Sequence, residues 1–411
     1  MKFLRLLVTG VRITRSEGIR SALARTRKRL SADILGQTVD MAVKTVDALE
    51  ADWTAPPPYL STPASVKSGP VTIAWIMSPP SSMSGGHHNL FRFIDFAEKA
   101  GHKCLIYFYT NTPVVVNSND MRAMLDASPA FPNLAAEMAM YDREVGVDPS
   151  VQAIFASGWE TAYPAFLDRS SARRFYFVQD YEPSFYAVGS ESILAENSYR
   201  FGFHGITAGG WLAKKLHDEF GMTTDHFDFA VDSETYFVTN RERRNEVFFY
   251  ARPVTPRRGF ELGIMALEEL SRRRPDVTIN LAGWDVTRWK IGFPHVNLSG
   301  MEISELNAVY NRCAAGLVLS ATNMSLLPLE LIASGVAPVV NDAPNNRLVS
   351  DNAYIEFVPT SPSAIARRMI EVIDRPNMPE RAVAMSESVR GTTWENSGKQ
   401  FVAAFERAMR G

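Results

Sequence analysis

The stretch Leu327-Pro328-Leu329-Glu330-Leu331-Ile332-Ala333-Ser334-Gly335-Val336-Ala337-Pro338-Val339-Val340 decides the fold class of this chain. Its first half has the pattern of an apolar helix, predicted over 327–334 and ended by Gly335. Its second half predicts a buried strand over 337–340, and another strand is predicted upstream at 316–320. A helix that joins two short apolar strands indicates a parallel sheet with helices on its faces.

The same alternation extends outward over most of the 411 residues. A polar, aperiodic stretch at 232–244 interrupts it, so we predict two doubly wound α/β domains in tandem. Further strands are predicted at 71–77, 104–109, 153–156, 174–178, 205–208, 247–251 and 277–282, and helices at 91–100, 259–273 and 303–312.

Composition fits this organisation: 46% of residues are apolar and 21% are charged, as in ordinary globular proteins. No apolar run reaches the roughly 18 residues that span a membrane. Cys104 and Cys313 lie in apolar runs, which indicates buried free thiols in a reducing, cytoplasmic compartment. The predicted parts are a basic helical segment (1–50), a proline-rich linker (51–70), a first domain (71–235), a second domain (236–395) and a C-terminal helix (396–411).

Charge is distributed unevenly along the chain. Residues 1–30 carry nine basic side chains and one acid, a net +8, whereas the whole chain has a net charge of -2. With apolar residues at helical spacing, this segment predicts an interfacial helix on an anionic membrane. The alternative is a helix packed on the main body with its basic face in water. The overall charge gives no general attraction to nucleic acid, so no nucleic-acid partner is expected.

Ligands of such sheets bind beyond the carboxyl ends of the strands, so the loops there hold the candidate site residues. Gly85 and Gly86 precede a helix, where backbone N–H groups can approach a phosphate; a plain turn is the alternative. Arg252, Arg257 and Arg258 follow the first strand of the second domain. Guanidinium groups there suit a diphosphate, with a solvated basic turn as the alternative.

Two more features suggest a sugar nucleotide. Glu330 is the single acid of an apolar helix, and a ribose diol would be a suitable partner; a capping or partly exposed acid is the alternative. The segment 176–186 is rich in aromatic and acidic residues, as sugar sites are. We assign Asp180 and Tyr181 to the site, with Trp159 from the preceding strand end, whereas core packing is favoured for the phenylalanines of the strand itself.

At these residues the chain resembles a known family. The segment 330–340 is similar to the second glutamate of the pattern E-G-F-G-x-x-x-x-E and the following A-x-A-x-G-x-P-V-V of GT-B glycosyltransferases of the large retaining class called family 4. Arg252 and the pair Arg258-Gly259 resemble the G-R and K-G elements of that class. The resemblance runs from about 71 to 395 and is most specific in the second domain. It implies two Rossmann-like domains that face each other across a cleft.

The resemblance also implies an activity: transfer of a sugar from a nucleoside diphosphate to a glycan or lipid-linked glycan acceptor, with retention of configuration and without metal or cofactor. Arg252 and Arg258 would hold the diphosphate, and we group Asp180 with them as catalytic. Gly85 and Gly86 form a candidate diphosphate loop. The residues expected to bind the donor nucleotide are Gly300, Met301, Ser325, Leu326, Leu327 and Glu330.

Two departures from the family pattern fall on sugar-reading positions. Thr322 takes the place of the first family glutamate, and Gln179 that of a histidine near the 6-position of the donor sugar. With Tyr181 and Trp159 they make up the predicted sugar and acceptor residues. These departures favour a 6-deoxy donor, first of all rhamnose carried by thymidine diphosphate, used for a cell-surface polysaccharide at the inner membrane face. The alternatives are a sugar-nucleotide epimerase and a degenerate glycan- or nucleotide-binding subunit.

Overall fold

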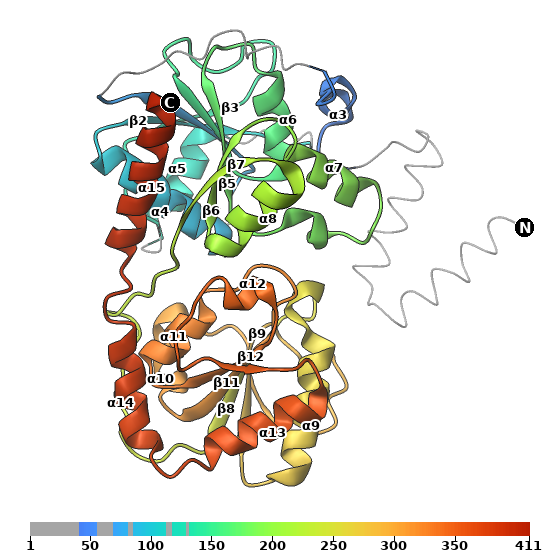
Figure 1. Cartoon of the computed structure of the whole chain (residues 1–411), viewed down its shortest axis with the longest axis vertical. Coiled ribbons are helices and arrows are strands. Elements are labelled where there is room, and N and C mark those ends of the chain that lie inside the picture. Colours follow the sequence, from blue (N-terminus) through green and yellow to red (C-terminus); the bar gives the residue numbers. More distant parts are fainter. Residues whose placement is uncertain (1–40, 56–68, 81–84, 112–116, 129–130) are drawn as a thin grey trace, which may run out of the picture.

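The computed structural model describes residues 41–55, 69–80, 85–111, 117–128 and 131–411. It consists of two α/β domains stacked along the long axis of the molecule, with the first domain in blue to green and most of the second in yellow to red (Figure 1). The membrane-binding helix predicted within 1–30, and most of the proline-rich linker, lie outside the described residues.

The first domain contains a parallel sheet of seven strands in the order β3-β2-β1-β4-β5-β6-β7. The five strands predicted from apolar runs are confirmed to within one residue at each end. The edge strands β3 and β7 were not predicted, because most of their side chains are partly or fully exposed and form no apolar run. The strands are β1 (Thr72–Met77), β2 (Lys103–Phe108), β3 (Glu137–Met140), β4 (Ala153–Ala156), β5 (Arg173–Val178), β6 (His204–Ala208) and β7 (Thr223–Phe227).

The second domain contains a parallel sheet of six strands in the order β10-β9-β8-β11-β12-β13. The four predicted strands are confirmed, although β11 begins three residues before its predicted start. The three-residue edge strands β10 and β13 were too short to predict. The strands are β8 (Glu246–Ala251), β9 (Thr278–Gly283), β10 (Val296–Leu298), β11 (Cys313–Val318), β12 (Ala337–Asn341) and β13 (Glu356–Val358).

Helices cover both faces of each sheet, as predicted for doubly wound domains (Figure 1). Gly335 has a φ of 74°, which places it in the left-handed region and confirms the helix end predicted there. The first-domain helices are α3 (Thr45–Glu50), α4 (Gly85–Lys99), α5 (Ser118–Asp126), α6 (Trp159–Leu167), α7 (Ser190–Ser198) and α8 (Gly210–Phe220). The second-domain helices are α9 (Phe260–Arg273), α10 (Ile303–Tyr310), α11 (Leu327–Ala333), α12 (Pro344–Arg347), α13 (Pro362–Ile373) and α14 (Met378–Ser388).

The last helix, α15 (Trp394–Arg410), returns from the second domain and packs on the first (Figure 1). Its Phe401 and Phe405 are fully buried, and their rings lie 5.8 and 5.6 Å from that of Phe155 in β4. Gly398 lets the helix approach α4 closely, since a Cβ there would lie 2.5 Å from the ring of Phe96. The tail helix expected at 396–411 is therefore part of the first domain's covering layer.

Both cysteines are buried and unpaired, as predicted from the sequence. In the described part of the chain, no helix is long and apolar enough to cross a membrane. The chain passes between the domains at 228–245 and at 389–393. Residues that follow strands of both sheets line one cavity, so the carboxyl ends of the two sheets face a shared cleft.

Candidate functional site

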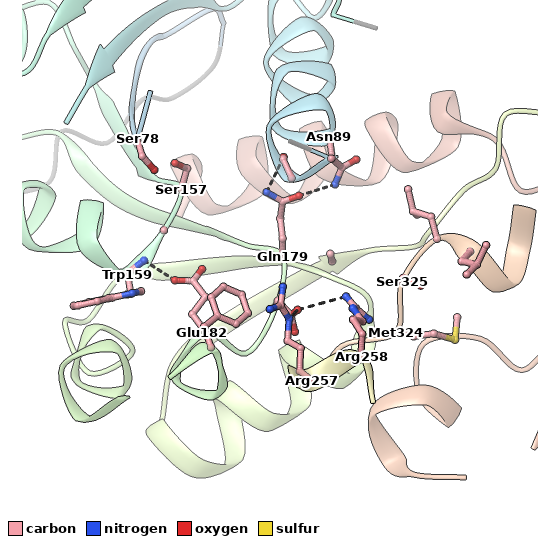
Figure 2. Close-up of a pocket in the computed structure, with 18 of the residues that line it drawn as sticks. Ser78, Asn89, Ser157, Trp159, Gln179, Glu182, Arg257, Arg258, Met324 and Ser325 are labelled. Atoms are coloured by element: carbon pink, nitrogen blue, oxygen red, sulfur yellow. Dashed lines mark hydrogen bonds and ion pairs between the residues drawn. The ribbon is translucent and has the colours of Figure 1, made fainter. Parts of the chain in front are cut away.

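A cavity of about 890 Å³ lies between the two domains and is lined by both. On the first-domain side, Ser78, Ser157 and Gln179 directly follow the strands β1, β4 and β5. On the other side, Arg258 follows β8 and Ser325 follows β11 (Figure 2). The cavity thus lies at the strand ends where the fold class places its ligands.

Asp180 lines this cavity and links the two domains. Its Oδ1 accepts hydrogen bonds from the backbone N–H groups of Tyr181 and Asn323, both at 2.9 Å. Its Oδ2 accepts from Nε of Arg257 at 3.1 Å and lies 3.7 Å from Nη2 of Arg258. Both carboxylate oxygens accept from protein donors, two of which lie in the second domain, so Asp180 links the two domains. Its catalytic role stays a prediction.

Asn323 completes this bridge from the second domain. Its side-chain amide donates to the backbone oxygens of Gln179 at 3.0 Å and Ala208 at 2.8 Å, both in the first domain. Its own backbone oxygen accepts from Nη1 of Arg258 at 3.2 Å. We define the Asp180 bridge as Asp180, Asn323, Arg257 and Arg258. Asn323 was not predicted, since nothing in its local sequence indicates partners 115 and 144 residues away.

The arginines nearest the cavity are Arg257 and Arg258. Arg258 also donates to Oγ of Ser320 at 2.9 Å, and its burial lowers the pKa of its guanidinium. Arg257 lies 4.1 Å from the centre of the Phe185 ring, which keeps its charge beside the cavity. Arg252, predicted to hold a diphosphate, does not line the cavity and instead donates to the hydroxyl of Tyr250 at 3.1 Å. We therefore correct the basic pair to Arg257 and Arg258.

Gly85 and Gly86 are the first residues of α4, and both line the cavity. The backbone oxygen of Gly86 accepts from Nε2 of Gln179 at 3.1 Å, while Oε1 of Gln179 accepts from Nδ2 of Asn89 at 3.1 Å (Figure 2). The start of this helix faces the cavity, and unpaired N–H groups at such a position favour an anion. The structure thus brings the predicted glycines and Gln179 together.

Helix α11 and the two residues before it supply the opposite wall, from Ser325, Leu326, Leu327 and Glu330. These are the positions predicted for that side of the site. Burial of Glu330 raises the pKa of its carboxyl to about 7, against which a hydrogen bond from the hydroxyl of Tyr310 has a smaller, lowering effect. Hydrogen bonds donated by a ligand would favour the charged form of this buried carboxyl.

Thr322 and Tyr181 lie outside the cavity wall, contrary to prediction. Thr322 is 1% exposed, and its backbone oxygen accepts from Oγ of Ser320 at 3.1 Å, which turns the loop inward at this position. The Tyr181 ring stacks 5.9 Å from the ring of Tyr199, which directly follows α7, and lies 4.4 Å from Nζ of Lys215 in α8.

Gly300 and Met301, predicted to read a nucleotide base, also lie outside the cavity lining. They form the turn that leads into α10, and Gly300 is exposed with a φ of 75°. The first residues of this region to line the cavity are Ile303, where α10 begins, and Leu306, one turn farther along that helix. In this region the cavity lining falls on the helix that follows the turn.

Trp159, which was predicted, lines the first-domain side together with two acids. Its backbone N–H donates to Oε2 of Glu182 at 2.5 Å (Figure 2). Its indole donates to the hydroxyl of Tyr186 at 3.0 Å. Glu160 accepts from Oγ of Ser78 at 2.9 Å. Burial raises the pKa of both carboxyls. Within the described residues, no group of three or more His, Cys, Asp or Glu side chains could hold a metal ion.

Sequence comparison relates parts of this chain to known proteins. Residues 245–370 match the family described as "WsaF, C-terminal domain". The O-antigen biosynthesis protein RfbC of Myxococcus xanthus is 31% identical over 348 residues, which cover 83% of this chain. The chain spans 27% of the length of that protein.

Solved structures establish the fold. Anabaena HepE in complex with UDP-glucose superimposes with a TM-score of 0.60 at 14% identity, over 82% of this chain and 99% of that one. Sucrose-phosphate synthase from Thermosynechococcus elongatus gives 0.59 at 12% identity, over 82% and 99% of the two chains. The chain therefore has the GT-B fold, as predicted, with two Rossmann-like domains.

The raised pKa of Glu330 predicts a pH-dependent stability. The folded protein holds the proton up to about pH 7, whereas the unfolded chain releases it near the ordinary value of 4.5. The free energy of unfolding of the wild type should therefore fall, relative to Glu330→Gln, as the pH rises from about 4.5 to 7. The relative loss should be on the order of 2–3 kcal/mol, measured by urea unfolding across that range. If the difference in the free energy of unfolding between the wild type and Glu330→Gln does not vary with pH, the prediction is contradicted.

Proposed function

We propose that this chain transfers a sugar from a nucleoside diphosphate donor to a growing cell-surface polysaccharide. The observation that carries the proposal is the pair Arg257 and Arg258 at the cavity between two domains of the GT-B fold. The similarity to a protein named for O-antigen biosynthesis supports the substrate class. So does the UDP-glucose in the HepE complex, which has the same fold.

Each part of the donor has a chemical counterpart in the cavity. Glu330 would accept hydrogen bonds from the ribose hydroxyls, beside Ser325 and Leu326. Arg257 and Arg258 would bind the diphosphate and offset the negative charge that develops on it as the glycosidic bond breaks. The start of α4 at Gly86 would face the diphosphate or the sugar. Retention of configuration, and a reaction without metal or cofactor, are parts of this proposal.

The donor sugar we propose is a 6-deoxyhexose, with rhamnose on thymidine diphosphate as the first candidate. Gln179 stands where the family has a histidine that reads the 6-position. Its amide oxygen accepts a hydrogen bond from the side chain of Asn89, and its amide nitrogen donates one to the backbone oxygen of Gly86. A side chain already engaged on both ends has less to offer a sugar hydroxyl, so the site does not require one.

The experiment that tests this function compares three donors: thymidine diphosphate rhamnose, uridine diphosphate glucose and guanosine diphosphate mannose. Release of the nucleoside diphosphate is measured for each, and the fastest release is expected from the rhamnose donor. Faster release from either 6-hydroxylated donor would overturn the donor assignment. Conversion of the sugar without diphosphate release would indicate an epimerase, and binding without turnover a binding subunit.

A second prediction concerns the diphosphate. Arg258→Ala should weaken the binding of uridine diphosphate about tenfold or more, because a charged hydrogen bond in a partly buried site is worth about 1.5–3 kcal/mol. Arg257→Ala should act in the same direction, whereas Arg272→Ala, on an exposed face of α9, serves as the matched control. Isothermal titration calorimetry provides the affinities. If both cavity variants bind like the wild type, the diphosphate site lies elsewhere.

We also propose a cytoplasmic location, with residues 1–30 bound to an anionic membrane surface. The described chain begins beside the cavity, since Ala42 lines it and donates its N–H to Oε1 of Glu191 at 3.2 Å. Lys44 donates its N–H to the hydroxyl of Tyr109, another lining residue, at 3.0 Å. A membrane-bound segment attached here would bring a lipid-linked acceptor close to the cavity.

Sedimentation with liposomes tests the membrane proposal. The full chain should sediment with vesicles that contain anionic lipid and remain in solution with neutral vesicles. The reason is that residues 1–30 contain nine basic residues and only one acidic residue. A chain without residues 1–30 should lose this difference. Equal sedimentation of the full and shortened chains would refute the assignment.

A further inference from the structure

The first-domain half of the cavity contains two acids that the donor does not require. Glu160 lies in the first turn of α6, after β4, and Glu182 begins the short 3-10 helix after β5. Since β4 and β5 are adjacent parallel strands, their carboxyl ends meet at one edge of the sheet. Both residues line the cavity from the first domain, whereas Glu330 and the two arginines line it from the second domain.

Glu182 has an unused hydrogen-bonding capacity in this wall. Its Oε2 accepts from the N–H of Trp159 at 2.5 Å and from the hydroxyl of Tyr176 at 2.9 Å. The described residues offer no hydrogen bond to its Oε1, although the residue is only 6% exposed. Glu160 is held by a single side-chain donor, Ser78. A buried carboxyl with free acceptor positions is costly unless a ligand supplies donors.

The electrostatics of this wall restrict the ligand. Neither Glu160 nor Glu182 forms an ion pair with any residue in the described ranges, and burial together with mutual repulsion raises the pKa of Glu182. An anionic group here would meet no cationic partner on this wall and would lose its hydration. The groups that donate hydrogen bonds to the two carboxyls are all neutral: the hydroxyls of Ser78 and Tyr176 and the N–H of Trp159. The wall thus accommodates hydroxyl and N–H groups.

The surrounding surface fits a sugar ring. The accessible rings of this wall are the exposed Phe185 and the partly exposed Tyr186, whose ring centre lies 5.7 Å from that of the buried Trp159 and nearly perpendicular to it. Aromatic faces contact the C–H groups of a pyranose, while the neighbouring acids accept from its hydroxyls. Figure 2 shows Glu182 and Trp159 together on the side of the cavity away from Ser325.

We propose that Glu160 and Glu182 form an acceptor subsite that binds hydroxyl groups of a neutral sugar and excludes acidic sugars. This inference rests on the proposed function, because it assigns the second substrate of the same cavity. It names two specificity-determining residues and a substrate class: the terminal unit of the acceptor glycan is an uncharged hexose or deoxyhexose, not a uronic acid or a phosphorylated sugar.

The test uses the full chain saturated with uridine diphosphate, so that the nucleotide half of the cavity is occupied. Binding of the methyl glycosides of glucose, galactose, mannose and rhamnose is compared with binding of glucuronic acid by ligand-observed NMR titration. At least one neutral glycoside should bind, and glucuronic acid should bind tenfold or more weakly than it. If glucuronic acid binds as tightly, or if none of the four glycosides binds, the proposal is overturned.

Charge-removing variants separate specificity from folding. Glu182→Gln and Glu160→Gln keep the side-chain shape, and each should weaken the neutral glycoside several-fold while bringing glucuronic acid closer to it in affinity. Glu219→Gln, on an exposed face of α8, is the matched control and should change neither value. If the ratio of the affinities for the neutral glycoside and glucuronic acid stays unchanged in both cavity variants, the subsite assignment is overturned. The affinity for uridine diphosphate, measured on the same samples, is expected to stay unchanged, so failure of the subsite is distinguishable from failure of the proposed function.

Discussion

The Asp180 bridge is the interaction on which the shape of the cavity depends. One carboxylate from the first domain accepts hydrogen bonds from the backbone of Asn323 and from Arg257 in the second. The side chain of Asn323 returns two hydrogen bonds to first-domain carbonyls. Because these groups are buried or nearly so, their partners cannot be replaced by water without cost. The bridge therefore fixes the distance between the two walls and orients the arginines at the same time.

The two walls differ in charge, and the bridge lies at the boundary between them. The second domain contributes Arg257 and Arg258, while the first contributes Glu160 and Glu182. Asp180 offsets part of the positive charge, so that the unliganded cavity is not strongly repulsive within itself. A substrate pair with a diphosphate on one side and uncharged hydroxyls on the other matches this division, as transfer from a nucleotide sugar to a neutral glycan requires.

The fold could be predicted from the sequence because central strands buried on both faces are continuous apolar runs, as in β12. Edge strands such as β3 expose alternate residues, so their sequence carries no such signal. In the site, Arg258 was predicted as an arginine that follows a strand and Glu330 as the single acid of an apolar helix, and both line the cavity. The inward turn at Thr322, the ring of Tyr181 and the partners of Asn323 depend on contacts between distant segments, which a local pattern does not encode.

The most direct test of this account is the free energy of unfolding of Asp180→Asn, measured by urea denaturation against the wild type. Asparagine keeps the side-chain oxygen that accepts from Tyr181 and Asn323, but its amide cannot accept from the arginines. The account predicts a loss of about 1.5–3 kcal/mol, since the removed interactions are hydrogen bonds between charged groups. Asp218→Asn, which removes an exposed pair with Lys214, should have a smaller effect. A stability of Asp180→Asn equal to that of the wild type would contradict the account.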